Sequence, residues 1–257
     1  MKIKNLLTET FTNLSNGQPS NLKVILTFII SAFALTSINY FSNLSNSLIF
    51  INQIGFGDSL SNLTEKITSY PDFQLLDLIY WALCSFFFYF LVPISLIKWG
   101  FKENLSEYGL GFSGVLSGFK LYFVFLLFML PLVWILSYTD SFQNTYPFYR
   151  VDYNHASIKH LLIWEGFYFL QFVGLEFFFR GFMVHALKKQ FGLYSILIMM
   201  IPYCMIHFGK PLPETVGAIF AGIILGILSM KSNSIWLGVM LHFSVAIAMD
   251  CFSLMHN

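Results

Sequence analysis

Long apolar stretches alternate with short polar segments along most of the chain. A helix that crosses a membrane needs about 20 mainly apolar residues. The pattern predicts about seven membrane helices (six to eight), at residues 23–44, 76–98, 118–138, 159–185, 193–207, 214–230 and 235–254. We therefore predict an all-α fold, a polytopic transmembrane helix bundle, that forms one integral membrane domain over residues 1–257.

Three stretches depart from the regular pattern. Residues 47–54 are partly apolar but too short to cross, and residues 104–117, with several Gly and Ser, are expected to lie at the membrane interface. The apolar stretch 192–207 is followed at once by prolines in 210–213, which stop a helix. At about 1.5 Å per residue, such a helix reaches only about 24 Å, less than the ~30 Å hydrocarbon core. We therefore expect His207 to lie below the membrane surface.

Basic residues are divided unevenly between the two sides of the predicted bundle. With a cytoplasmic N-terminus, nine lie inside: Lys2, Lys4, Lys23, Lys98, Lys102, Lys120, Lys188, Lys189 and Lys231. Four lie outside: Lys66, Arg150, Lys159 and Lys210. This excess follows the positive-inside rule. We therefore expect a multi-pass protein of the plasma membrane with its N-terminus in the cytoplasm.

The composition supports a membrane protein and excludes several other classes. The chain is 56% hydrophobic and 11% charged, whereas a soluble domain carries about 25% charged residues. A net charge of +1 gives no reason to expect a nucleic-acid partner. The three cysteines lack the paired spacing of a disulfide framework or a zinc ribbon, so we expect no metal and no cofactor.

Ionisable residues within the apolar stretches gather in the second half of the chain. Residues 174–182 read G-L-E-F-F-F-R-G-F and place Glu176 and Arg180 one helical turn apart, in the order that favours an ion pair. A charge at mid-membrane costs roughly 2.5–3.5 kcal/mol, so such residues usually have a function. Taken singly, His207 could cap a helix and His242 could be a packing residue. Together, three helices each bring an acid–base group into the membrane, which predicts a catalytic site.

These residues form a pattern that resembles a known family. The pattern is E-x-x-x-R-G on one helix, an aromatic residue four before a histidine on the next, and a late histidine on the last. It is similar to the CPBP family of intramembrane endopeptidases, which comprises CAAX prenyl proteases and Abi-like bacteriocin-processing and immunity proteins. The similarity covers residues 158–254, the expected catalytic core.

The resemblance implies a role for each matching residue. Glu176 matches the second glutamate of the family's E-E-x-x-x-R motif and Arg180 its arginine, while Tyr203 and His207 match the F-x-x-x-H motif and His242 the third. It implies hydrolysis without a covalent intermediate, by water held between Glu176 and His207. His242 would stabilise the oxyanion and Arg180 would position Glu176. The implied substrate is a membrane-associated protein or peptide, such as a prenylated CAAX-like one.

The chain departs from the family pattern at two positions. Leu175 stands where the family has the first glutamate, its proposed general base, and Ala246 stands where it has an asparagine. Losing one oxyanion donor typically slows a reaction by about 10²–10³-fold. Glu176 itself could serve as the base, with Glu165 and Glu214 as further candidates. Asp250 lies about 12 Å beyond His242 along a helix axis, too far to replace the asparagine directly.

Two other classes of function stay open on the sequence. Leu175 and Ala246 favour a catalytically inactive family member that binds a membrane protein or acts in immunity. A transporter could use the same ionisable residues as a proton relay. The chain shows no sign of the inverted repeats that are typical of many transporters. An endopeptidase is therefore the leading prediction.

Overall fold

The computed structural model describes residues 21–56, 64–112, 114–150 and 158–256. Every regular element in these residues is a helix. Six helical segments are long and apolar enough to cross a membrane. Three of them are single helices: α2 (Leu22–Phe41), α12 (Leu212–Ser232) and α13 (Trp236–His256). A fourth is formed by α7 (Val115–Leu136). The other two are continuous segments: Phe73–Phe101 contains α5 (Phe73–Phe86) and α6 (Val92–Ser95), and Ile158–Phe191 contains α9 (Ile158–Glu176) and α10 (Val184–Phe191). With the shorter apolar helix α11 (Tyr194–Met205), they confirm the predicted all-α polytopic bundle.

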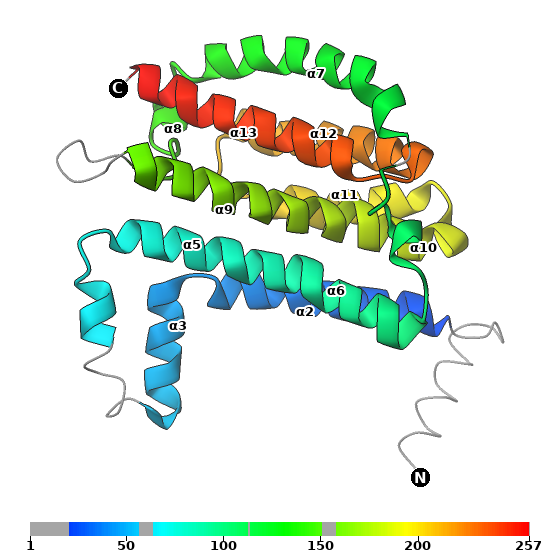
Figure 1. Ribbon diagram of the computed structural model, residues 1–257, viewed down its shortest axis with the longest axis horizontal. Coiled ribbons are helices and arrows are strands. Elements are labelled where there is room, and N and C mark those ends of the chain that lie inside the picture. Colours follow the sequence, from blue (N-terminus) through cyan, green and yellow to red (C-terminus); the bar gives the residue numbers. More distant parts are fainter. Residues whose placement is uncertain (1–20, 57–63, 113, 151–157, 257) are drawn as a thin grey trace.

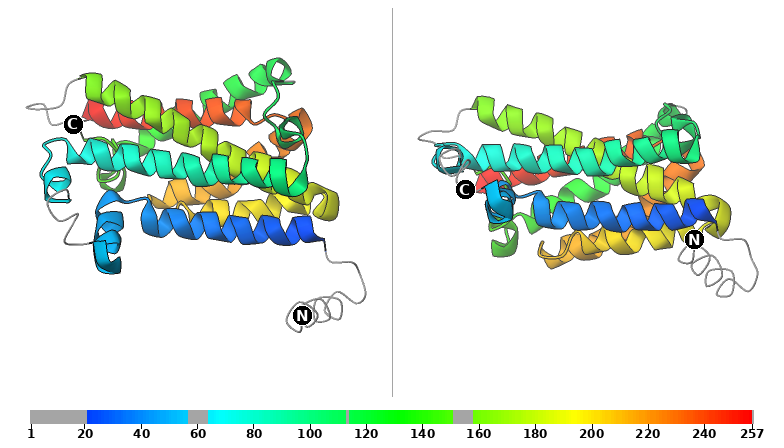
Figure 2. Two further views of the ribbon diagram at one scale, coloured as in Figure 1. Left: turned by 60° about the horizontal axis from the view of Figure 1, so that its bottom comes forward. Right: turned by 90° about the horizontal axis from the view of Figure 1, so that it is seen from below.

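The long helices run roughly parallel or antiparallel to one another (Figures 1 and 2). In Figure 1, α7 lies at one edge of the bundle beside α13, and α2 and α5 lie at the opposite edge. The helices α9, α11, α12 and α13 occupy the middle, where α11 packs against α12 and α9 packs against both α5 and α13. The second half of the chain therefore forms the centre of the bundle.

The outer surface of the bundle is suited to lipid. On α7, the side chains of Phe123, Leu127 and Phe128 are 63%, 77% and 69% exposed. Large apolar side chains exposed along a whole helix favour contact with hydrocarbon over contact with water. The protein is therefore an integral multi-pass membrane protein. Its location in the plasma membrane and the cytoplasmic side of its N-terminus stay predictions.

Shorter elements connect the membrane helices. As expected, the stretch from residue 47 does not cross: α3 (Leu44–Ile51) is short and lies crosswise to α2 (Figure 1). The side chain of Asn43 caps α3 by accepting a hydrogen bond from the Asn46 backbone at 2.9 Å. The remaining described connectors contain a 3₁₀ turn at Leu105–Tyr108, inside the predicted 104–117 segment, and α8 (Asp140–Gln143).

Helix α11 is short, as the sequence predicts. Its 12 residues span about 18 Å, well below the ~30 Å of a hydrocarbon core. Its neighbour α12 comes close because Gly222 has no side chain: a Cβ there would lie 3.0 Å from Met200 and 3.2 Å from Tyr203. This close packing fixes the end of α11, and with it Tyr203 and His207, at the centre of the bundle.

Candidate active site

Glu176 and Arg180 form the predicted ion pair at the centre of the bundle. Glu176 is the last residue of α9 (Ile158–Glu176), which continues as a π-helical turn over Phe177–Met183. Both side chains are fully buried, and Arg180 Nη1 lies 3.2 Å from Glu176 Oε1. The guanidinium also stacks 3.8 Å from the centre of the Tyr203 ring. A buried charge needs such partners, because leaving it unpaired is costly.

His242 on α13 connects this ion pair to α11. Its Nδ1 lies 2.7 Å from Glu176 Oε1, and its Nε2 lies 2.9 Å from the Tyr203 hydroxyl. An ionised carboxylate only accepts hydrogen bonds, so Nδ1 donates to Glu176. In a neutral imidazole, Nε2 then accepts from the Tyr203 hydroxyl. The result is a hydrogen-bonded chain, Glu176–His242–Tyr203, that joins three helices.

His207 lies in the turn after α11 and is held through its backbone and ring. Its Nδ1 lies 2.8 Å from the Tyr203 carbonyl oxygen, and its own carbonyl accepts a 2.8 Å hydrogen bond from the Thr215 hydroxyl. Because a carbonyl only accepts, Nδ1 carries the proton and Nε2 of the neutral ring is an acceptor. Among the described residues, no group forms a hydrogen bond with Nε2. His207 can therefore accept a proton or a hydrogen bond from a small molecule.

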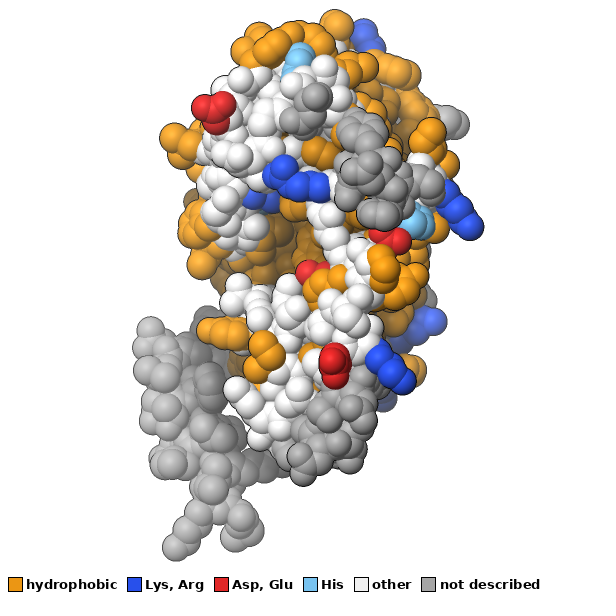
Figure 3. Space-filling model, turned by 90° about the vertical axis from the view of Figure 1, so that its left-hand side faces the viewer, with side chains coloured by type: hydrophobic (Ala, Val, Ile, Leu, Met, Phe, Trp, Pro, Cys, Tyr) orange, Lys and Arg blue, Asp and Glu red, His pale blue; other side chains and the backbone are white. Residues whose placement is uncertain are grey.

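Both histidines line one cavity of about 530 Å³. Leu175 and Ala246, the two positions that depart from the family pattern, line the same cavity. Its lining also includes residues from the end of the bundle shown in Figure 3, where the surface is hollowed and has hydrophobic walls. Glu176 is fully buried and is not part of the cavity lining. His242 thus lies between Glu176 and the cavity, and the role of Glu176 in catalysis stays a prediction.

A second, apolar cavity of about 700 Å³ lies between α7, α12 and α13. Phe128, Phe220 and Ile224 are among its walls. It shares His207, Glu214 and His242 with the first cavity, since these residues line both. The two imidazoles and the Glu214 carboxylate thus lie where a polar and an apolar cavity meet.

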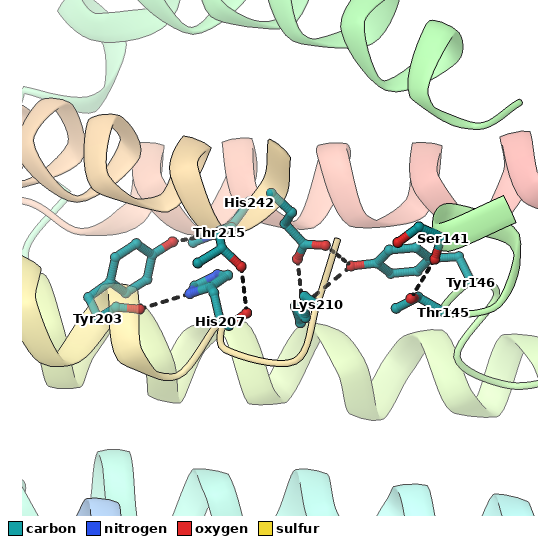
Figure 4. Close-up of polar contacts among 9 residues, drawn as sticks. Ser141, Thr145, Tyr146, Tyr203, His207, Lys210, Thr215 and His242 are labelled. Carbon is teal, nitrogen blue, oxygen red and sulfur yellow. Dashed lines mark hydrogen bonds and ion pairs between the residues drawn. The ribbon is translucent and has the colours of Figure 1, made fainter. Parts of the chain in front are cut away.

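A polar cluster that the sequence only partly indicated lies beside His207. Lys210 Nζ is 2.6 Å from Glu214 Oε1, and the Tyr146 hydroxyl donates a 2.7 Å hydrogen bond to Glu214 Oε2. Figure 4 shows Tyr203, His207, Lys210 and Tyr146 in a row. Burial and the nearby Glu214 charge raise the pKa of Tyr146, so its hydroxyl stays protonated as a donor. The sequence analysis named Glu214 as a further candidate for the catalytic base. No motif indicated Tyr146, which lies 68 residues before Glu214 in the sequence.

The other acidic candidates lie elsewhere. Glu165 is half-buried and lines neither cavity. Asp250 is buried and lines neither cavity, and it accepts a 3.3 Å hydrogen bond from the Phe148 backbone, so it anchors a connecting segment. Within the described ranges, no cluster of three His, Cys, Asp or Glu side chains is arranged to hold a metal ion.

Fold and site together define a multi-pass membrane protein with a buried acid–base centre. Residues 157–248 match the model of the family described as type II CAAX prenyl endopeptidase, Rce1-like. The match confirms the resemblance seen in the motifs. No curated protein and no solved structure matches the chain. Because the family is one of membrane proteases, the match supports peptidase activity on a membrane-associated substrate.

Proposed function

We propose that the protein is an intramembrane endopeptidase that hydrolyses a peptide bond of a membrane-associated substrate. The observation that carries this proposal is that His207 and His242 line one cavity within the region that matches a protease family. Nε2 of His207 is an acceptor without a partner among the described groups, as the activation of water requires. Hydrolysis by this route needs no covalent intermediate.

The geometry supports a distinct role for each of the predicted site residues. Water would bind to Nε2 of His207, and the scissile carbonyl would lie against His242 and Tyr203. Glu176 would act as a positioning residue behind His242, because its carboxylate is buried and engaged there. Arg180 would balance the charge of Glu176. This assignment replaces the predicted role of Glu176 as the water-activating base.

The two cavities support a substrate with a peptide part and an apolar part. The first cavity has polar groups for a peptide backbone, and the second is walled by apolar side chains of α7 and α12. A prenyl chain or an apolar helix end would bury its surface in the second cavity, at about 25 cal/mol per Å². A prenylated CAAX-like peptide fits this division.

The test is cleavage of membrane-tethered peptides by the full-length protein in liposomes. We expect His207→Ala to lower kcat by about 10²-fold or more, the usual contribution of an acid–base group. His160→Ala is the matched control, because His160 pairs with Asp72 away from both cavities. The proposal fails if the His207→Ala protein cleaves as fast as the wild type, or if the wild type cleaves neither prenylated nor unmodified peptides.

A second candidate function is a family member that binds a membrane protein without cleaving it. The observation that favours it is that Leu175 and Ala246 line the cavity where the family pattern has a glutamate and an asparagine. In that case, a membrane-tethered peptide would bind and stay intact. The activity of the protein in cells would also survive Glu176→Ala, provided that the variant folds.

A further inference from the structure

We propose that Glu214 is the general base and acid of this site and supplies the carboxylate that Leu175 lacks. This inference rests on the proposed peptidase function. Glu214 lies in the first turn of α12, seven residues after His207, and enters the cavities from a different helix than the family's motif glutamates do. Leu175, which stands where the family pattern has its first glutamate, and Glu214 line the same cavity.

Of the described carboxylates, Glu214 is the one on the lining of the cavity that contains both histidines. Glu176 is sealed behind His242, and Glu165 and Asp250 line neither cavity. The Glu214 side chain is 14% exposed, so water can reach it although the group is mostly buried. A carboxylate in this environment can exchange a proton with a bound molecule.

The neighbours of Glu214 hold its carboxylate in a fixed direction. Lys210 contacts Oε1 at 2.6 Å and the Tyr146 hydroxyl donates to Oε2 at 2.7 Å. Lys210 also lies 3.3 Å from the Tyr146 hydroxyl, which closes the cluster. Each carboxylate oxygen has about two acceptor positions, so each keeps one after these contacts. The base is therefore oriented and still able to accept a proton from water.

The reaction balances with Glu214 as the one group that takes up a proton, while Nε2 of His207 holds the water by accepting a hydrogen bond from its other hydrogen. As the water oxygen bonds to the carbonyl carbon, one water proton moves to Glu214, and the carbonyl π electrons move to its oxygen. The Tyr203 hydroxyl, which donates to Nε2 of His242 in the free site, turns to donate its hydrogen bond to this oxyanion. When the C–N bond breaks and the carbonyl re-forms, Glu214 returns the proton to the leaving nitrogen. The products are a carboxylic acid and an amine, and Glu214 regains its charge.

The test is Glu214→Gln in the same liposome cleavage assay. Gln keeps the size and one acceptor oxygen but takes up no proton at neutral pH. We expect kcat to fall by about 10²-fold or more with KM within about threefold of the wild type. Glu165→Gln is the matched control, since Glu165 lies off both cavities, and should cleave at the wild-type rate. The inference is overturned if Glu214→Gln keeps wild-type kcat while His207→Ala loses it.

A second variant controls for a loss of folding, because Glu214→Gln leaves Lys210 without its charged partner. Lys210→Met combined with Glu214→Gln removes both charges of the pair. A folded double variant with the wild-type kcat would overturn the inference, and one with the lowered kcat of the single variant supports it. Adding Leu175→Glu to Glu214→Gln should restore part of the lost kcat, because residue 175 faces the same cavity. If instead His207→Ala stays fully active, the proposed function itself fails.

Discussion

The hydroxyl of Tyr203 lies 2.9 Å from Nε2 of His242. The family motif places a phenylalanine at position 203, so this hydrogen bond is an addition of the present chain. The asparagine that Ala246 replaces would be an oxyanion donor. A tyrosine hydroxyl can take this role when it turns from Nε2 of His242 to the oxyanion. The chain thus has a polar group near His242 that the motif by itself does not provide.

Tyr203→Phe tests the importance of this hydroxyl. The change restores the family residue and conserves the ring that packs against Arg180 and His207. We expect the fold to be kept and kcat for a membrane-tethered peptide to fall by about 10²-fold, the typical effect of losing an oxyanion donor. Cleavage kinetics and the thermal unfolding midpoint should be measured together. An unchanged kcat would exclude Tyr203 from the chemistry.

Arg180→Met should be strongly destabilising. Glu176 is fully buried, so removing its partner leaves a buried charge with His242 as its neighbour. Breaking such a pair costs about 3–5 kcal/mol, whereas replacing both members is much better tolerated. We expect Arg180→Met combined with Glu176→Gln to regain most of the lost stability in a detergent unfolding experiment. If both variants are equally destabilised, the two side chains are not coupled.

Gly238→Ala should disturb the same centre from α13. A Cβ at position 238 would overlap Oε2 of Glu176. Overpacking of this kind costs about 1–3 kcal/mol, and the displaced carboxylate would release His242, so activity should fall as well. The matched control is Gly166→Ala on α9, where a Cβ meets no atom within 4 Å. The control should be as stable as the wild type or slightly more so, and equal losses in both variants would contradict the prediction.

Acid should weaken the ion pair between Lys23 and Glu103, which lies at the end of the bundle where α2 begins. Burial raises the pKa of Glu103, but hydrogen bonds from Lys23 and Tyr108 outweigh burial and lower it overall. A carboxyl group with a lowered pKa adds stability above its unfolded pKa, about 4.3, and loses it as the pH falls through the folded pKa. The unfolding midpoint should therefore decrease as the pH falls below about 4.3 and through the lowered pKa of Glu103. Glu103→Gln should reduce this decrease, and an equal decrease in the variant would exclude the contact as its source.

The sequence by itself determined the membrane helices, the short helix before His207, the Glu176–Arg180 pair and the family. These features are local: apolar length defines a span, prolines end a helix, and residues four apart meet on one helix face. The helix boundaries predicted from the sequence were less accurate where a helix extends beyond its apolar residues. The helix predicted at 159–185 continues to Phe191, because backbone hydrogen bonding does not stop where polar residues begin.

The tertiary structure alone decided which residues line the cavity. The orientation of α9 about its own axis directs Leu175 to the cavity and Glu176 to Arg180 and His242. Leu175 and Glu176 therefore face different neighbours although they are adjacent in the sequence. Tyr146 and Glu214 are 68 residues apart and meet only because the chain between them packs across the bundle. Helix rotation and long-range packing depend on all neighbouring helices at once, and no local pattern of residues encodes them.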